Sequence, residues 1–235
     1  MINIKNLHKK FGKLVVLDNL DLEINKGGVF AILGPNGSGK TTLIKSILGM
    51  VIPNKGEILY NGKSVLKEWE YRKNLNYLPQ IANFPANLSV IELIEMVKNL
   101  RSSKTNEKEL IALFGLTPFL KQKLGNLSGG TKQKVNIVLT FMFDNELIIL
   151  DEPTTGLDPI ALIYLKDLIN KAKDDGKTVL ITSHIMSFVE EISDEIVFLL
   201  DGKIYFKGSI EAIKKQTESP TLEIAIANLI KKQYA

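Results

Sequence analysis

The sequence predicts an α/β protein in which a helical segment is inserted between two halves of a strand-containing core. Short β-rich runs alternate with turns over residues 1–80, and strand-like runs return after residue 146. Between them, residues 89–143 carry apolar side chains at helical spacing. The 235 residues, 45% of them hydrophobic, are enough to bury a sizeable core.

Strands and turns are expected over most of the first 80 residues. The last early run, Val29–Leu33, is apolar throughout, as in a strand buried on both faces. A helix is expected from Lys40 to about Leu48, and Asn61-Gly62 is a hairpin signal. The expected strands are Ile2–Asn6, Leu14–Leu17, Leu20–Ile24, Val29–Leu33, Glu57–Tyr60 and Leu75–Leu78.

The second half of the core returns to strands alternating with helices. Strands are expected at Leu147–Leu150, Val179–Thr182 and Ile196–Leu200. A helix is expected from Pro159 to about Lys173, because proline is tolerated in a first helical turn. After Ser219-Pro220 an amphipathic stretch predicts a short final helix that packs on the core.

Composition excludes several classes of protein. The net charge of +4 suits a phosphate-bearing ligand or an anionic membrane face, but it is too small to argue for a nucleic-acid partner. The absence of cysteine excludes disulfides and thiolate metal sites, and it fits a reducing compartment. No apolar run approaches the roughly 20 residues of a membrane helix, and the start lacks a signal-peptide core. We therefore expect a soluble protein that acts at a membrane only through a partner.

A glycine-rich loop, GPNGSGKTT, fits the pattern G-x-x-x-x-G-K-[ST] between a buried strand and a helix. The glycines let backbone N–H groups converge on phosphate oxygens. Lys40 would add a positive charge at the β and γ phosphates, and the Thr41 hydroxyl would ligate Mg²⁺. A glycine-rich turn with a surface lysine is the plainer alternative. The residues expected to hold nucleotide here are Gly34, Pro35, Asn36, Gly37, Ser38, Gly39, Lys40, Thr41 and Thr42.

Two carboxylates follow the apolar run LIIL. Asp151 would hold Mg²⁺ through water, and Glu152 would act as the general base on the attacking water, a role that contributes about 10²–10⁴-fold in rate. Acidic residues at strand ends also serve simply to solubilise them. Together with the phosphate loop, however, the pair predicts a P-loop nucleotide hydrolase that uses Mg²⁺. These two motifs do not choose a family.

A second anion site is predicted by Leu127-Ser128-Gly129-Gly130, where a hydroxyl and unobstructed N–H groups open a helix. The plainer alternative is a serine N-cap followed by a loop. The motif stands about twenty residues before the acidic strand end, and in this it resembles the signature motif of ABC ATPases. That resemblance covers residues 1 to about 215. It implies a RecA-like P-loop core with an N-terminal antiparallel β subdomain and an inserted α-helical subdomain.

The resemblance also implies a division of the chain. Residues 1–80 and 147–215 would form the ATP-binding core, residues 81–146 the inserted helical subdomain with the signature motif, and residues 216–235 a C-terminal helical extension.

Four further positions match ABC motifs, all in family order. Gln80 would sense Mg²⁺ and link to a transmembrane partner, and His184 would contact the γ-phosphate. Asp158 would lie in the D-loop, which in that family crosses a subunit interface. Phe11 would stack on adenine, a contact of about 1–3 kcal/mol by analogy with base stacking. Each residue also has a plainer alternative. Gln80 would be a polar loop residue and His184 an ordinary histidine at a strand end. Asp158 would be a helix N-cap before Pro159, and Phe11 an exposed or core phenylalanine.

Three residues stand outside the family pattern. The glutamine usual after LSGG is Thr131 here, which puts any ribose contact from that position in doubt. Trp69 and His8 match no motif, and we interpret them as a packing and a surface residue.

The resemblance implies that two copies, in the simplest case a homodimer, pair head to tail. Each ATP would lie between the phosphate loop of one copy and Ser128, Gly129 and Gly130 of the other. It further implies a separate transmembrane permease, gripped at Gln80 and the loop Ile81–Ser89. The chain would then be cytoplasmic and peripheral on the inner face of the cell membrane.

A finer resemblance concerns the runs LSGGTKQKVN, FMFDNELIILDEPTTGLDP and TSHIMSFVEEISDEIVFLLDGKI. These are similar to NosF-type cassettes, the ATPases of the copper-related ABC system that matures nitrous oxide reductase. This likeness implies a copper- or sulfur-related cargo, or a mechanical role in maturation, with a periplasmic accessory protein. The alternatives are a drug, peptide or lipid exporter cassette, and a non-transport ABC ATPase acting on ribosomes or DNA. The last would be expected in tandem or with a long coiled coil. A kinase or GTPase would leave LSGG and His184 without a role.

Overall fold

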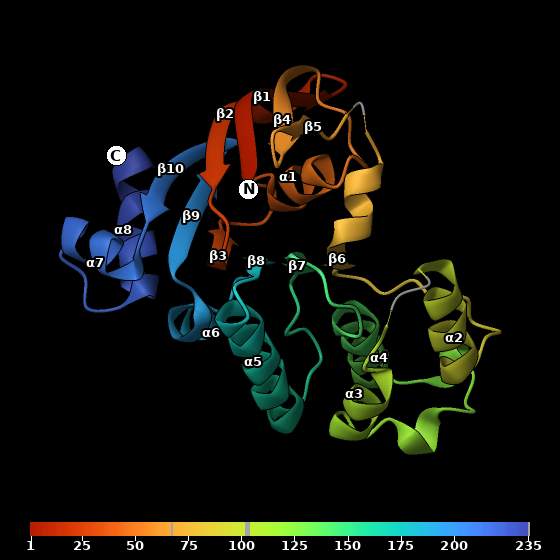
Figure 1. Ribbon diagram of the computed structural model, residues 1–235. Coiled ribbons are helices and arrows are strands. Elements are labelled where there is room, and N and C mark those ends of the chain that lie inside the picture. Colours follow the sequence, from red (N-terminus) through yellow and green to blue (C-terminus); the bar gives the residue numbers. More distant parts are fainter. Residues whose placement is uncertain (67, 102–103, 235) are drawn as a thin grey trace.

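A computed structural model describes residues 1–66, 68–101 and 104–234, and in this part of the chain the strands form two sheets (Figure 1). The first sheet is antiparallel and has the strand order β2-β1-β4-β5. The second has the order β10-β9-β3-β8-β7-β6 and is parallel except for the β9–β10 pair. An α/β fold with an N-terminal antiparallel β subdomain is therefore confirmed.

The antiparallel sheet departs from the sequence prediction at one point. Its strands are β1 (Ile2–Phe11), β2 (Leu14–Ile24), β4 (Lys55–Tyr60) and β5 (Lys63–Ser64). The predicted hairpin is confirmed, because Asn61 and Gly62 both have positive φ, +48° and +80°. The two short runs predicted between residues 14 and 24 form one strand instead. Asn19, with φ +48°, makes a bulge that interrupts the alternation but not the pairing with β1.

The parallel sheet carries its strands through the middle of the molecule. They are β3 (Gly28–Leu33), β6 (Leu75–Leu78), β7 (Leu147–Asp151), β8 (Thr178–Thr182), β9 (Glu195–Leu200) and β10 (Lys203–Gly208). Every residue of β7 and β8 is buried, as expected of parallel strands covered on both faces. Because β3, β6, β7 and β8 run the same way, their carboxyl ends meet at one edge, where ligands of open α/β sheets bind.

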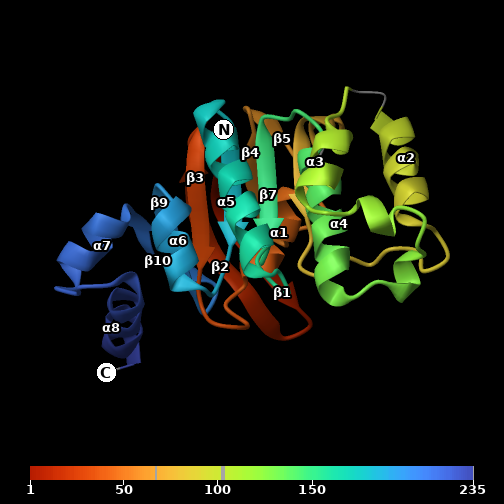
Figure 2. The same cartoon turned by 90° about the horizontal axis from the view of Figure 1, so that it is seen from below.

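Separate hydrophobic clusters lie on the two faces of this sheet. Different elements cover the two faces (Figures 1 and 2). On one face lie α1 (Lys40–Ile47) and the antiparallel sheet, packed on alternate side chains such as Phe30 and Ile32. On the other face α5 (Pro159–Asp174) and α6 (Met186–Ile192) pack on the intervening side chains, such as Ala31 and Leu33. This alternation explains why β3 is apolar throughout.

The predicted helical insert lies to one side of the sheets (Figures 1 and 2). It contains α2 (Val90–Arg101), α3 (Glu107–Leu113) and α4 (Gly129–Phe141), joined by the short turns η2 (Thr117–Phe119) and η3 (Leu124–Asn126). The helical character expected over residues 89–143 is therefore confirmed for the described residues. The domain bounds at residues 80, 146 and 215 stay a prediction, since positions of elements do not by themselves define units.

The chain closes with α7 (Ile210–Gln216) and α8 (Leu222–Tyr234), which lie beside α6 (Figure 1). Leu222 and Ala225 are fully buried, so the predicted final helix does pack on the core. The Glu190 carboxylate on α6 accepts from the Leu222 N–H at 3.1 Å and pairs with Lys214 at 2.5 Å. One acidic side chain thus fastens both terminal helices.

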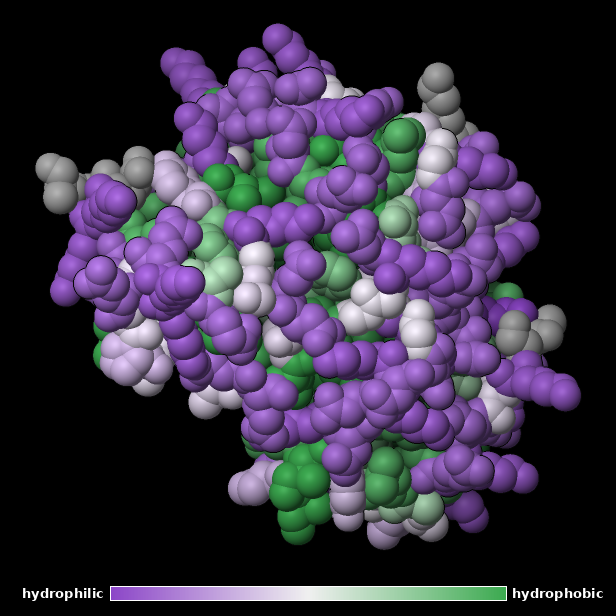
Figure 3. Space-filling view, turned by 60° about the vertical axis from the view of Figure 1, so that its left-hand side comes forward, coloured by the Kyte–Doolittle hydropathy of each residue, from purple (hydrophilic) through white to green (hydrophobic). Residues whose placement is uncertain are grey.

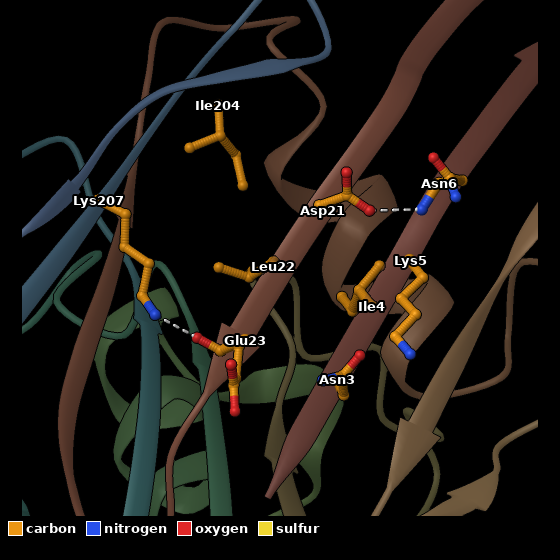
Figure 4. A pocket seen from close by; sticks show the side chains of 9 residues that line it. All are labelled: Asn3, Ile4, Lys5, Asn6, Asp21, Leu22, Glu23, Ile204 and Lys207. Carbon is orange, nitrogen blue, oxygen red and sulfur yellow. Dashed lines mark hydrogen bonds between the residues drawn. The ribbon is translucent and has the colours of Figure 1, made fainter.

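A depression of about 470 Å³ marks the place where the edge strands β2 and β10 meet (Figure 4). Across it the Lys207 ammonium group donates to the Glu23 carbonyl oxygen at 2.6 Å. Along its floor the Asn6 N–H donates to the Asp21 carboxylate at 2.7 Å. The Lys207 contact therefore ties the two sheets to each other.

Several features were not predicted. The turn η1 (Glu70–Asn74), α6, α7 and β10 were missed, since the first three have five to seven residues, too few for a periodic pattern. The packing role expected for Trp69 is wrong, because this side chain is 63% exposed and Lys73 Nζ lies 5.0 Å from the centre of its ring. His8 is only partly exposed, with Nδ1 3.4 Å from the Asp18 carboxylate.

The face that carries β10, α7 and α8 forward is mostly hydrophilic, with smaller apolar patches between the polar side chains (Figure 3). Among the helices of the described residues, none has both the length and the apolar composition that crossing a bilayer requires.

Candidate nucleotide site

A depression of about 410 Å³ lies where the carboxyl ends of β3, β6 and β7 face the β1–β2 turn. Its wall therefore combines the parallel sheet, which carries the acidic residues, with the antiparallel sheet, which carries Phe11. The lining residues are Phe11, Leu14, Val16, Asn36, Gly37, Gly39, Lys40, Thr41, Thr42, Gln80, Asp151 and Glu152.

The phosphate loop needs its glycines for two different reasons. Gly37 has φ +83° and nothing within 4 Å of an added Cβ, so it keeps the backbone open to a ligand. Gly39 has φ +106°, and a Cβ there would lie 2.8 Å from the Val16 carbonyl oxygen. Three predicted loop residues, Gly34, Pro35 and Ser38, are absent from the lining. At Gly34 the loop packs closely against β9, because an added Cβ would lie 2.1 Å from the Leu199 carbonyl oxygen.

Cationic and dipolar groups converge on the loop. Lys40 is buried, and its ammonium group donates to the carbonyl oxygens of Gly34 at 2.7 Å and Pro35 at 3.0 Å. An ammonium group has three donors, so one remains for a phosphate oxygen. Burial lowers the pKa of Lys40, while the carboxylates of Glu152 and Asp151 act to raise it. No side chain caps the start of α1, so its first N–H groups are available to an anion.

The acidic strand end fits a hard cation. Asp151 is 1% exposed, and its Oδ1 accepts from the Thr182 hydroxyl at 2.5 Å. Its buried Oδ2 has no hydrogen-bond partner in the described part of the chain. A buried carboxylate oxygen without a hydrogen-bond partner is expected to bind a ligand. Thr41 and Gln80 line the same depression, and their side-chain oxygens are ligands of the kind that Mg²⁺ prefers. The residues present therefore fit Mg²⁺.

Glu152 is held in an uncommon backbone conformation, with φ +51°. Its N–H donates to the Thr182 hydroxyl oxygen at 3.0 Å and to the Thr182 carbonyl oxygen at 3.1 Å. Its side chain is nearly buried, and Oε2 lies 2.7 Å from His184 Nδ1. The structure thus brings two residues predicted separately, Glu152 and His184, into direct contact.

The signature residues lie on another surface, at the amino-terminal ends of α4 and α5. Ser128 caps α4 by accepting the Thr131 N–H at 3.2 Å, and both Ser128 and Gly129 are exposed. Asp158 caps α5 by accepting the Ala161 N–H at 2.9 Å. The capping alternative therefore holds at both positions. It leaves the exposed N–H groups free to meet a ligand.

A close backbone approach joins these two helix ends. A Cβ on Gly130 would lie 2.6 Å from the Gly156 carbonyl oxygen. Beside it the Asp158 carboxylate pairs with Lys134 at 2.6 Å, and this contact, followed by the Ala161 N–H, lowers the pKa of Asp158. The signature turn and the D-loop therefore form one surface, distinct from the depression.

Two functional candidates were missed by sequence reasoning. Thr182 contacts both Asp151 and Glu152, and its signal is a threonine at the end of an apolar strand. Gln133 is buried on α4, and its Nε2 donates to the Pro153 carbonyl oxygen at 2.9 Å. Its signal is a long amide side chain in a buried helical position. Gln133 thus connects the signature helix to the loop that follows Glu152.

A strand, a glycine loop and a helix beside a strand that ends in two carboxylates define a phosphate-loop nucleotide-binding protein. The family model described as "ABC transporter" matches residues 17–155. The chain therefore belongs to the ABC transporter family.

Relatives and solved structures agree with this assignment. The lantibiotic transport ATP-binding protein SrtF of Streptococcus pyogenes is 37% identical over 93% of this chain and 95% of its own length. The bacitracin transport ATP-binding protein BcrA of Bacillus licheniformis is 33% identical over 92% of this chain and 72% of its own length.

Among solved structures, an ATP-binding subunit of an ABC transporter has a TM-score of 0.91, 30% identity, and coverage of 98% of this chain and 99% of that one. A dimeric ATP-binding cassette in a post-hydrolysis state with ADP and Pi has a TM-score of 0.77, 26% identity, and coverage of 89% and 98%. The P-loop core and ATP hydrolysis predicted from the sequence are therefore confirmed.

Proposed function

We propose that this chain is the ATPase subunit of a transporter that exports peptides of the antibiotic class. The observation that carries this proposal is the 37% identity to a lantibiotic transport ATP-binding protein over nearly the whole of both chains. The bacitracin transport relative supports it independently. Neither relative is named for copper, so the similarity to nitrous oxide reductase systems, with its periplasmic accessory protein, gains no support from them. The peptide-exporter alternative is therefore favoured.

The depression supports a division of labour for ATP hydrolysis. We propose that the loop N–H groups and Lys40 bind the β and γ phosphates, and that Thr41, Gln80 and Asp151 hold Mg²⁺. When bound, this ion neutralises charge on the phosphate oxygens. Glu152 then accepts a proton from the attacking water.

His184 supports Glu152 in this scheme. Hydrogen bonding between His184 Nδ1 and Glu152 Oε2 fixes one carboxylate oxygen and leaves the other to receive the proton. The exposed outer part of the imidazole ring can then face the γ-phosphate.

The two separate surfaces support a dimer in which each ATP is shared. Ser128–Gly130 are not among the residues that line the depression, so a signature turn that meets nucleotide has to come from a second copy. The solved cassette with ADP and Pi is a dimer, which supports the pairing of two copies. ATP then favours the closed pair, and its hydrolysis removes the bridge and lets the pair open.

Phe11 is 51% exposed and lines the depression, which suits stacking on adenine. We expect Phe11→Ala to raise the Kd for ATP by about 5- to 150-fold, since base stacking on an aromatic ring is worth about 1–3 kcal/mol. Fluorescent-nucleotide titration measures this. Val15→Ala, an exposed and non-lining neighbour on β2, should leave the Kd unchanged. Equal values for both variants would remove Phe11 from the adenine site.

Exposed apolar side chains support a docking site for a permease segment. Ile81, in the loop proposed to grip the permease, is 73% exposed. A separate depression of about 570 Å³, beside the start of β6, contains Trp69 and Leu100, which are 63% and 77% exposed. Its charged lining consists of four cationic residues, Arg72, Lys73, Arg101 and Lys104, and one acidic residue, Asp144. We propose two contacts, because Ile81 follows β6 and the depression lies beside the start of that strand. A permease segment with apolar side chains would suit Ile81, and one with apolar and acidic side chains would suit the depression. Either contact would place the chain on the inner face of the membrane.

We expect Ile81→Asp and Trp69→Asp to reduce recovery of the permease by at least tenfold, because each puts a charge into the proposed contact. Pull-down from detergent-solubilised membranes measures the recovery. Ile163→Asp, at an exposed position on α5, is the matched control and should bind normally. Full recovery with both test variants would place the docking surface elsewhere.

Peptide tolerance tests the cargo. Cells that produce the chain with its permease should survive a lantibiotic or bacitracin better than cells that produce Glu152→Gln. If tolerance is unchanged while copper-dependent nitrous oxide reductase activity falls in the variant, the copper-related function is correct instead.

A further inference from the structure

Thr131 contacts the hydroxyl group of Ser128 twice. Its backbone N–H donates to Ser128 Oγ at 3.2 Å, and its Oγ1 lies 2.9 Å from the same oxygen. Ser128 is exposed at the tip of α4, whereas Thr131 is partly buried one turn further on. The position that departs from the family pattern is therefore directly connected to the serine of the signature motif.

The hydrogen-bonding capacity of a serine hydroxyl decides what these contacts do. The group has one donor and two acceptor sites. The Thr131 N–H occupies one acceptor site, and of the two hydroxyl groups either can donate to the other. When the Thr131 hydroxyl donates, its proton occupies the second acceptor site of Ser128. The proton of Ser128 then has to point away from Thr131, off the helix tip.

We propose that Thr131 is a positioning residue whose hydroxyl donates to Ser128 and thereby presents the Ser128 O–H as a donor to the γ-phosphate of ATP held by a second copy of the chain. This rests on the proposed function, in which Ser128 meets the nucleotide of the partner.

The approaching anion selects this direction of the hydroxyl pair. With the opposite direction, Ser128 would donate to Thr131 and turn a lone pair toward the phosphate, which is repulsive. Donation from Thr131 also polarises the Ser128 O–H, since hydrogen bonds in a chain strengthen one another. Thr131 thus contributes to nucleotide binding through the Ser128 hydroxyl, because its own side chain is too short to donate a hydrogen bond to the nucleotide directly.

The test compares Thr131→Val with Thr131→Ser. Valine keeps the shape and the capping N–H but removes the hydroxyl, so we expect kcat to fall about 3- to 10-fold, as for the loss of one neutral hydrogen bond. The KM for ATP should change less than about twofold, because the first nucleotide contact lies in the other half of the site. Serine restores the hydroxyl and should restore kcat. Thr131→Ala serves as a second hydroxyl-free variant if valine disturbs folding.

A double-mutant cycle separates positioning from packing. In a Ser128→Ala background, Thr131→Val should cause no further loss of kcat, because there is no hydroxyl left to position. A further loss equal to that in the wild-type background would overturn the proposal, as would normal kcat in Thr131→Val and Thr131→Ala. If instead Ser128→Ala itself turns over normally, the proposed role of Ser128 fails together with the inference. By contrast, if Ser128→Ala lowers kcat and the Thr131 variants do not, only the inference about Thr131 fails and the proposed role of Ser128 stands.

Discussion

Glu152→Gln is expected to lower kcat for ATP hydrolysis by about 10²- to 10⁴-fold, because an amide cannot accept the proton of the attacking water. The replacement has nearly the same shape, and the amide oxygen can still accept a hydrogen bond from His184. ATP binding should therefore change only a few-fold. Phosphate release under single-turnover conditions measures the chemical step, and a nucleotide titration measures binding.

Glu146→Gln is the matched control, since Glu146 is exposed at the opposite end of the same strand and pairs with Lys26 at 3.3 Å. This variant should hydrolyse ATP normally. Normal turnover in Glu152→Gln would show that another group is the base.

Gly129→Asp is expected to lower kcat by about a hundredfold or more while a single copy still binds ATP. An added Cβ meets nothing within 4 Å, so the fold should tolerate the change. A carboxylate at a helix start is even favourable for the isolated chain. Facing a phosphate about 5 Å away, however, it would cost about 3 kcal/mol at an effective dielectric constant near 20, which corresponds to that loss in rate.

Gln122→Asp introduces the same charge change at an exposed position in the same helical insert and should leave kcat unaltered. Steady-state kinetics with a thermal-unfolding control measures both variants. If Gly129→Asp hydrolyses ATP normally, the signature turn does not face nucleotide.

Much of this molecule could be predicted because its motifs are local. The phosphate loop requires a glycine at positions such as Gly37 whatever surrounds it, and a strand buried on both faces reads as a continuous apolar run. The chemistry of Lys40, Asp151 and Glu152 follows from their side chains. The structure adds that Phe11 and Gln80 line the same depression as these three residues.

What escaped prediction depends on contacts between distant parts of the chain. Thr182 lies 30 positions from Glu152 in the sequence, and only the parallel pairing of β7 with β8 brings them together. The close approach of Gly130 to Gly156 and the Gln133 contact to Pro153 depend in the same way on how α4 packs. The packing role expected for Trp69 was wrong because a tryptophan is usually largely buried, whereas Trp69 lies on an exposed surface among cationic side chains.

The cargo is hard to predict for a physical reason. ATP chemistry fixes the residues of the nucleotide site, but in the proposed function the transported molecule would contact the permease rather than this chain. Similarity along the signature and acidic-strand segments therefore pointed to copper-related cassettes, whereas two relatives that match more than nine-tenths of this chain are named for lantibiotic and bacitracin transport.

Site-directed cross-linking tests the shared nucleotide site most directly. The chain has no cysteine, so Asn36→Cys in the phosphate loop of one copy and Ser128→Cys in another supply the only thiols of the two copies. Both copies carry Glu152→Gln, and the permease is present. The two copies differ in size, so a cross-linked pair of different copies can be recognised. We predict that a short thiol cross-linker joins the two different copies when Mg-ATP is added and not with ADP. Failure to form this heterodimer with Mg-ATP, while each variant still binds nucleotide, would contradict the head-to-tail arrangement.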